Sequence, residues 1–304
     1  MWPVRPSAET LTDVVPFVAV LLMGFVPSRH QPESSFLASQ RWRYRDLIIV
    51  FGVITVINFV PIPAGSFTPG GPLWAIIPAW IALLVMASVW VPVRWRHRRP
   101  WRALGFEPST ALYNALWALR IALGLGSAFA VLMLWVRRHS SGIDNAASVP
   151  LPTTSHGQLG DFLAWYVIAA VLGPIAEEMV FRGFAYGLLF RKFGPAGAAV
   201  ASAALWAAGH SMRLSYGSAF KTLFLVMVGI VYAEVYRRRQ SLFPTVAFHI
   251  VGNSASVLIR DRYLSGLVPF AGAWVGLWVL SVVLFQVVYR SRSAKDPEVR
   301  PTSI

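Results

Sequence analysis

The chain has 304 residues, of which 56% are hydrophobic and only 13% are charged. A soluble domain usually carries about 25% charged residues, so this composition indicates an integral membrane protein. The sequence contains no cysteine, which excludes disulfides, thiolate metal sites and a cysteine nucleophile. The net charge of +14 comes from basic residues that lie between apolar runs, where they orient membrane helices, so we expect no nucleic-acid binding.

The apolar runs predict up to nine transmembrane helices, because a bilayer core needs about 20 apolar residues per helix. The first run, at 11–27, is short, so the expected number of spans is eight or nine. The other runs cover residues 47–63, 73–93, 112–136, 162–190, 195–210, 219–236, 242–259 and 267–289. We therefore expect an all-α fold, a polytopic transmembrane helix bundle.

Basic residues are concentrated in alternate connecting segments, which predicts the orientation of the helices. Most of the 27 Lys and Arg residues lie in the segments 28–46, 94–110, 191–194, 237–241 and 290–304. By the positive-inside rule these segments and the C-terminus face the cytoplasm, with the N-terminus outside if the first run spans the membrane and inside if it does not. We expect a multi-pass protein of the plasma membrane of a prokaryote.

Changes in composition divide the chain into four parts. Residues 1–137 are expected to form N-terminal transmembrane helices with few polar side chains. The polar segment 138–161 is expected to be the largest external loop, and 162–290 a second transmembrane domain that holds the intramembrane polar residues of interest. The polar residues 291–304 are expected to form a disordered tail.

Two adjacent carboxylates and an arginine, Glu177, Glu178 and Arg182, lie inside the apolar run at 162–190. A charge in hydrocarbon costs several kcal/mol unless it is paired or lines a wet cavity. On a helix Glu178 and Arg182 are four residues apart and can pair, whereas Glu177 points about 100° away from Glu178. One carboxylate is thus left for acid–base chemistry, although an ion pair that only locks helix packing would give the same pattern.

Further polar residues lie in two other apolar runs. His210 falls at the outer end of its predicted span, and His249 and Asn253 lie on one face of theirs. Polar side chains in a bundle face its interior or a wet cavity, so we expect these groups to converge. A carboxylate base, imidazoles and amide donors are the groups required for water-activated hydrolysis. The expected site lies between helices around 162–190, 195–212 and 242–259.

These residues resemble the three motifs of the CAAX protease and bacteriocin-processing enzyme family, which includes the type II CAAX prenyl endopeptidases. The first motif, Glu-Glu-x-x-x-Arg, is matched at 177–182. The second, Phe-x-x-x-His, resembles 206–210, with Trp206 where the family usually has Phe. The third, His-x-x-x-Asn/Asp, is matched at 249–253. The resemblance covers roughly 162–259 and implies an intramembrane endopeptidase.

The resemblance also implies a role for each residue. Glu177 would activate the attacking water, assisted by His210. His249 and Asn253 would stabilise the tetrahedral oxyanion. Glu178 and Arg182 are the supporting residues, which would shape the site, orient Glu177 or contact the substrate.

Members of the family have been described both as metalloproteases and as metal-independent glutamate proteases. Glu177, His210 and His249 would provide three zinc ligands with an open position for water. The sequence has no His-Glu-x-x-His pair, however, and each ligand comes from a different span. We favour a glutamate-type mechanism with no cofactor, with zinc as the alternative.

Two other classes of function are compatible with an intramembrane polar cluster. A non-catalytic scaffold or regulator would keep the cluster for packing, but such a relative would be expected to lose at least one member of the motifs. A transporter with a Glu–His proton relay would be expected to show repeated halves and paired broken helices, which the sequence lacks. The expected partners are therefore the bilayer and a membrane-associated protein or peptide substrate.

Overall fold

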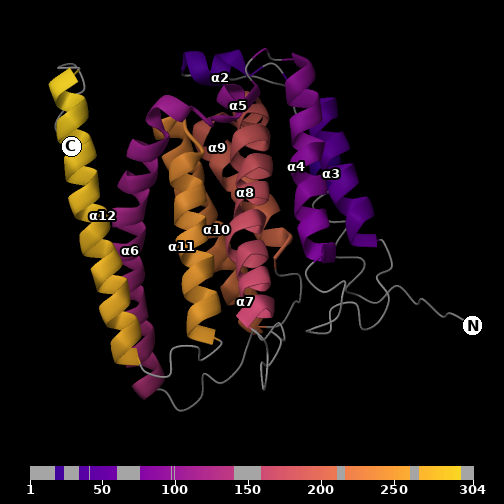
Figure 1. The fold of residues 1–304 in the computed structure, drawn as a ribbon. Coiled ribbons are helices and arrows are strands. Elements are labelled where there is room, and N and C mark those ends of the chain that lie inside the picture. The colour runs from indigo at the N-terminus through magenta and orange to yellow at the C-terminus, as the bar shows by residue number, and fades with distance from the viewer. Residues whose placement is uncertain are drawn as a thin grey trace, which may run out of the picture.

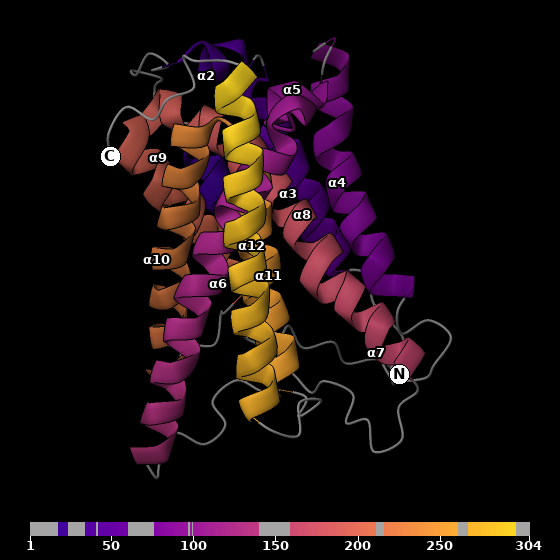
Figure 2. The same ribbon diagram turned by 60° about the vertical axis from the view of Figure 1, so that its left-hand side comes forward.

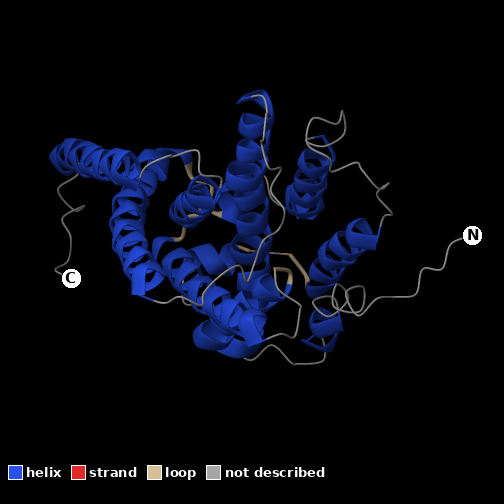
Figure 3. Cartoon of the chain, turned by 90° about the horizontal axis from the view of Figure 1, so that it is seen from below, coloured by secondary structure: helices blue, strands red, loops and turns tan. Residues whose placement is uncertain are grey.

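The computed structural model describes residues 18–23, 34–40, 42–59, 76–96, 98, 100–139, 159–210, 216–260 and 267–295. Within these residues every regular element is a helix and no strand occurs (Figure 3), which confirms the all-α class. Most of the run at 11–27, of the expected loop at 138–161 and of the expected tail at 291–304 lies outside the described residues.

The helices follow the expected apolar runs closely. In chain order they are α2 (Ser35–Ser39), α3 (Tyr44–Phe59), α4 (Ile76–Arg96), α5 (Pro100–Leu104), α6 (Pro108–His139), α7 (Leu159–Tyr166), η1 (Val167–Leu172), α8 (Gly173–Glu178), η2 (Met179–Tyr186), α9 (Gly187–Ala208), α10 (Tyr216–Arg239), α11 (Phe243–Arg260) and α12 (Leu267–Lys295). The elements η1 and η2 are π-helices. The last helix continues into the segment expected to be a tail.

Three stretches in the described part of the chain are long and apolar enough to cross a membrane by length and composition. They are Ile76–Arg96, Phe162–Ala208 and Trp274–Ser291. The total of eight or nine spans stays a prediction. The apolar helices indicate an integral membrane protein.

The long stretch Phe162–Ala208 reverses at Gly194 and is not one straight helix. Gly194 has a φ of 70° and a ψ of −176°, a left-handed conformation that glycine adopts at little cost. Pro195 follows, where its fixed φ and missing N–H suit the first turn of a new helix. The chain therefore forms a helical hairpin, as the separate runs at 162–190 and 195–210 predicted.

The helices form one bundle (Figure 1). The hairpin that turns at Gly194 packs through α9 on α10, and α11 packs on both α8 and α6. On one side of the bundle α12 lies on the outside, against α6 (Figure 2). On the other side α3 and α4 pack together and contact η2.

Three of the basic connecting segments, which the charge pattern placed on one side of the membrane, meet at one end of the bundle, at the top of Figure 1. They are the segments 28–46, 94–110 and 237–241. The buried Gln40 donates from Nε2 to the hydroxyl of Tyr236 (3.0 Å) and to the carbonyl of Ala103 (3.2 Å). The backbone N–H of Leu242 donates to the carbonyl of Gly105 at 2.9 Å. Segments far apart in the sequence are thus joined by hydrogen bonds at this end.

The helices α9 and α10 approach closely at Gly229. A Cβ atom at this position would lie 2.7 Å from Cβ and 3.0 Å from Cα of Ala203. Small residues allow such close backbone contact between membrane helices. The carbonyl of Gly229 also accepts a hydrogen bond from Nη2 of Arg182 at 3.3 Å, so this contact helps to hold the intramembrane arginine.

We expect Gly229→Val to lower the thermal unfolding midpoint in detergent, because overpacking a close contact costs about 1–3 kcal/mol. The matched control is Gly276→Val on α12, where an added Cβ would meet nothing within 4 Å. Both variants carry the same β-branched side chain in a helix, so the helix propensity is the same. Equal midpoints for the two variants would contradict the close packing of α9 on α10.

Candidate active site

The hairpin at Gly194 sets the positions of two candidate residues. Glu177 precedes the turn by nearly as many residues as His210 follows it, so the two antiparallel arms bring them to the same level. Nε2 of His210 lies 3.4 Å from Oε2 of Glu177. His210 lies just beyond the end of α9, as the sequence predicted, and this end of the helix lies beside Glu177.

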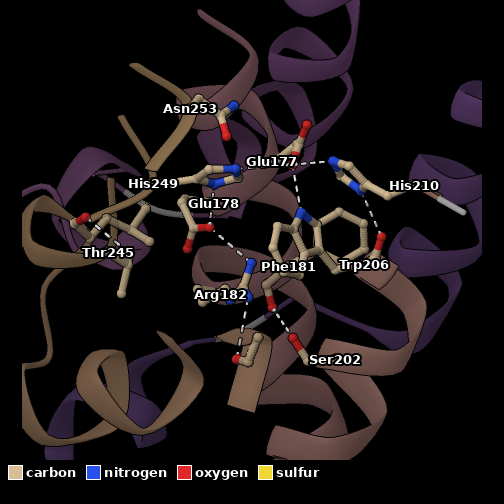
Figure 4. Close-up of polar contacts among 12 residues, drawn as sticks. Glu177, Glu178, Phe181, Arg182, Ser202, Trp206, His210, Thr245, His249 and Asn253 are labelled. Carbon is tan, nitrogen blue, oxygen red and sulfur yellow. Dashed lines mark hydrogen bonds and ion pairs between the residues drawn. The ribbon is translucent and has the colours of Figure 1, made fainter. Parts of the chain in front are cut away.

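The helix α11 brings His249 to the same site. Leu242, the residue before its first turn, lies against η2, since a Cβ added at Gly183 would be 3.0 Å from Cδ1 of Leu242. Further along α11, and earlier along the first arm of the hairpin, Nδ1 of His249 lies 3.0 Å from Oε1 of Glu178 in α8. All three motifs therefore meet, as the sequence predicted (Figure 4).

One part of the site is a buried ion pair that also holds an imidazole. Glu178 and Arg182 are both completely buried, and Nη1 of Arg182 donates to Oε1 of Glu178 at 2.9 Å. The same oxygen accepts from Nδ1 of His249, because a carboxylate paired with arginine can only accept. Glu178 thus fixes the ring of His249 so that its Nε2 points toward Glu177, 3.7 Å from Oε2.

Aromatic side chains from α9 and α10 enclose the guanidinium of Arg182. Its Cζ lies 5.0 Å from the centroid of the Trp206 ring and 5.3 Å from that of Tyr232. A cation over an aromatic face is stabilised by the ring quadrupole, more so when it is desolvated. These contacts stabilise the charge of Arg182 in addition to its bonds to Glu178 and Gly229.

The other part of the site is accessible. The side chains of Glu177 and His210 are 28% and 33% exposed. Nδ1 of His210 lies 3.0 Å from the carbonyl oxygen of Trp206, which can only accept, so Nδ1 carries a hydrogen. Nε2 of His210 therefore faces Glu177, as Nε2 of His249 does from the other side (Figure 4).

Trp206 contacts several of the candidate residues, which its motif alone did not predict. Its Nε1–H donates to Oε2 of Glu177 at 2.5 Å, and its ring lies 5.1 Å from that of His210 and 5.3 Å from that of His249. The sequence has tryptophan at this position, where the family usually has phenylalanine. An indole has an N–H donor that phenylalanine lacks, and this difference was the signal for the contact. The contribution of Tyr232 on α10 had no sequence signal, since that helix carries no motif.

Asn253 lies beside His249 and binds the backbone of the neighbouring helix. Its Nδ2 donates to the carbonyl of Ala169 in η1 at 2.9 Å. The amide nitrogen has a second hydrogen and the side chain also has a carbonyl oxygen. Asn253 therefore lies at the site with one of its two amide hydrogens already donated to the carbonyl of Ala169.

The two π-helical segments flank the glutamates and were not predicted. In each segment one carbonyl accepts a hydrogen bond from a side chain of another helix. Asn253 bonds to Ala169 in η1, and Oγ of Ser202 bonds to Phe181 in η2 at 3.0 Å. π-Helical segments are rare and frequently occur at functional sites.

The three candidate zinc ligands do not form a zinc site in this arrangement. In the part of the chain that the structure describes, no three His, Asp or Glu side chains are placed to hold a metal ion. Oε2 of Glu177 lies 3.4 Å from Nε2 of His210 and 3.7 Å from Nε2 of His249. We therefore derive no step through a metal.

Comparison with known proteins gives one match. Residues 159–255 match the family model of type II CAAX prenyl endopeptidase Rce1-like proteins. No curated protein and no solved structure matches the chain significantly. The matched segment contains all three motifs and ends just after Asn253. Over residues 159–255, the chain is thus similar to the type II CAAX prenyl endopeptidases of the Rce1-like family, which confirms the resemblance inferred from its motifs.

Proposed function

We propose that the chain is an intramembrane endopeptidase that hydrolyses a peptide bond of a membrane-associated protein or peptide. The observation that best supports this function is the position of Glu177. Its carboxylate is partly exposed, faces two imidazole nitrogens and is not paired with any arginine that the structure describes, whereas its neighbour Glu178 is buried with Arg182. A carboxylate kept only for packing would not need to be exposed.

In the proposed mechanism Glu177 removes a proton from a water molecule, with Nε2 of His210 helping to hold that water. The water oxygen forms a bond to the substrate carbonyl carbon, and the carbonyl oxygen becomes an oxyanion. Nε2 of His249, when it carries a proton, and the second amide hydrogen of Asn253 donate to the oxyanion. The C–N bond then breaks as Glu177 passes its proton to the leaving nitrogen.

Glu178 and Arg182 are assigned to positioning. Glu178 holds the His249 ring through Nδ1, and Arg182 neutralises Glu178 and ties it to α9 and α10. The alternative function, a non-catalytic scaffold or regulator, would need this buried pair but not Glu177. We further propose that residues 162–290 form the catalytic domain, and that the basic end of the bundle and the C-terminus face the cytoplasm of a prokaryote.

We expect Glu177→Gln, His210→Ala and His249→Ala each to reduce cleavage at least ~100-fold, because positioned proton transfer contributes about 10²–10⁴-fold. The assay uses the purified protein in nanodiscs with a panel of membrane-anchored fluorogenic peptides, with and without a prenylated cysteine near the C-terminus. The matched control is Glu234→Gln, whose carboxylate pairs with Arg237 and Arg238 at the end of α10. Cleavage at the wild-type rate by all the site variants would contradict the proposal.

The requirement for a metal is tested in the same assay with a strong chelator. We expect unchanged cleavage, because the proposed proton transfers use only the side chains of Glu177 and the two histidines. Loss of activity that zinc restores, and that no other added divalent ion restores, would show that the site binds zinc during the reaction.

We expect Trp206→Phe to lower kcat/KM roughly 10- to 100-fold, because a hydrogen bond to a charged group contributes about 1.5–3 kcal/mol. Phenylalanine keeps an aromatic ring beside Arg182 and removes the N–H that binds Glu177. The control is Trp274→Phe on α12, which removes an indole bond to the carbonyl of Leu123. Wild-type kcat/KM in Trp206→Phe would show that this bond does not position Glu177.

A further inference from the structure

Two arginines lie on a continuous aromatic surface between α6, α10 and α12: Arg120, which is outside the segment matched by the family model, and Arg239, which is within it. Cζ of Arg120 lies 3.8 Å from the centroid of the Phe285 ring. Cζ of Arg239 lies 4.0 Å from that of Trp117 and 5.8 Å from that of Tyr113. The Tyr113 and Phe285 rings are 5.3 Å apart, so the two guanidiniums share one aromatic surface.

Neither guanidinium has a carboxylate partner among the described side chains. The neighbouring acidic residues are paired elsewhere: Asp46 with Arg96, Glu107 with Arg102, Glu178 with Arg182, and Glu234 with Arg237 and Arg238. Nε of Arg120 is buried without a hydrogen-bond partner, and Arg120 and Arg239 repel each other electrostatically. Aromatic contacts stabilise each cation separately, but they do not remove the repulsion between the two.

An arginine within a membrane helix that lacks a counter-ion is costly, and such residues commonly mark a functional site. Arg120 lies within α6, well inside its ends, and exposed leucines and valines occur on both α6 and α12. Leu112 on α6 is 61% exposed, and Leu284 and Val287 on α12 are 43% and 61% exposed. The two arginines therefore lie beside an apolar surface suited to acyl chains, at the same end of the bundle as the basic connecting segments.

We propose that Arg120 and Arg239 bind the phosphate of an anionic phospholipid whose acyl chains lie along α6 and α12. A guanidinium offers two parallel N–H donors to phosphate oxygens, and basic pockets between transmembrane helices bind anionic head groups. The negative charge would offset the repulsion between the two arginines and join α6, α10 and α12. This site is separate from the proposed catalytic residues and does not depend on their function.

The test measures thermal unfolding of the purified, delipidated protein in detergent, titrated with phosphatidylglycerol or with phosphatidylcholine. We expect phosphatidylglycerol alone to raise the midpoint, and the Arg120→Gln, Arg239→Gln double variant to bind it about tenfold more weakly, or worse, because each basic residue near an anionic head group adds to binding. Arg290→Gln, at an exposed position on the same end of α12, removes an equal charge and should respond like the wild type.

The single variant Arg239→Gln keeps the helix-embedded Arg120, so it tests the site even if the double variant does not fold. We expect it to weaken binding severalfold, and native mass spectrometry should show less phosphatidylglycerol retained than in Arg290→Gln. Equal responses to the two lipids, or an equal loss in Arg290→Gln, would overturn the proposal. Equal protection by inorganic phosphate, lost in the Arg239 variant, would show a free-anion site and overturn the lipid assignment.

Discussion

The buried ion pair between Glu178 and Arg182 is the interaction on which the arrangement of the site depends. Two charges buried without solvent in a membrane bundle need each other and further polar contacts. Here Arg182 also bonds to Gly229 on α10 and lies against the Trp206 ring on α9, while Glu178 bonds to His249 on α11. Each of these partners lies on a different helix, so the pair fixes the relative positions of the helices that carry the motifs.

Adjacent residues of the same type consequently have different environments. Glu178 is enclosed, whereas Glu177 lies one residue earlier, is partly exposed and faces both imidazoles. The two imidazoles are held in the same way, each by an acceptor at Nδ1, which leaves both Nε2 atoms directed toward Glu177. The buried charge of Glu178 is thus neutralised by Arg182, and the carboxylate of Glu177, one residue earlier, is available for acid–base chemistry.

The parts of the site that the sequence predicted are those determined by spacing within one helix or by the need to bury polar groups together. The spacing of Glu178 and Arg182 predicted their pairing. The polar residues within three otherwise apolar runs predicted that these side chains would converge. The indole of Trp206 was visible in the sequence as an additional donor, but its contact with Glu177 depends on how α9 is rotated against α8, which the spacing within one helix does not determine. The level of His210 depends on the turn at Gly194, and the π-helical segments have carbonyls that bond to Asn253 and Ser202 on other helices, contacts that are distant in the sequence.

The most direct test compares two isosteric substitutions at neighbouring positions, Glu177→Gln and Glu178→Gln, by thermal unfolding and by peptide cleavage. We predict that Glu177→Gln unfolds at the wild-type temperature but does not cleave. We predict that Glu178→Gln unfolds at a lower temperature, because removing one partner of a buried ion pair costs about 3–5 kcal/mol. A stable and fully active Glu178→Gln, or an active Glu177→Gln, would contradict the division of roles between the two glutamates.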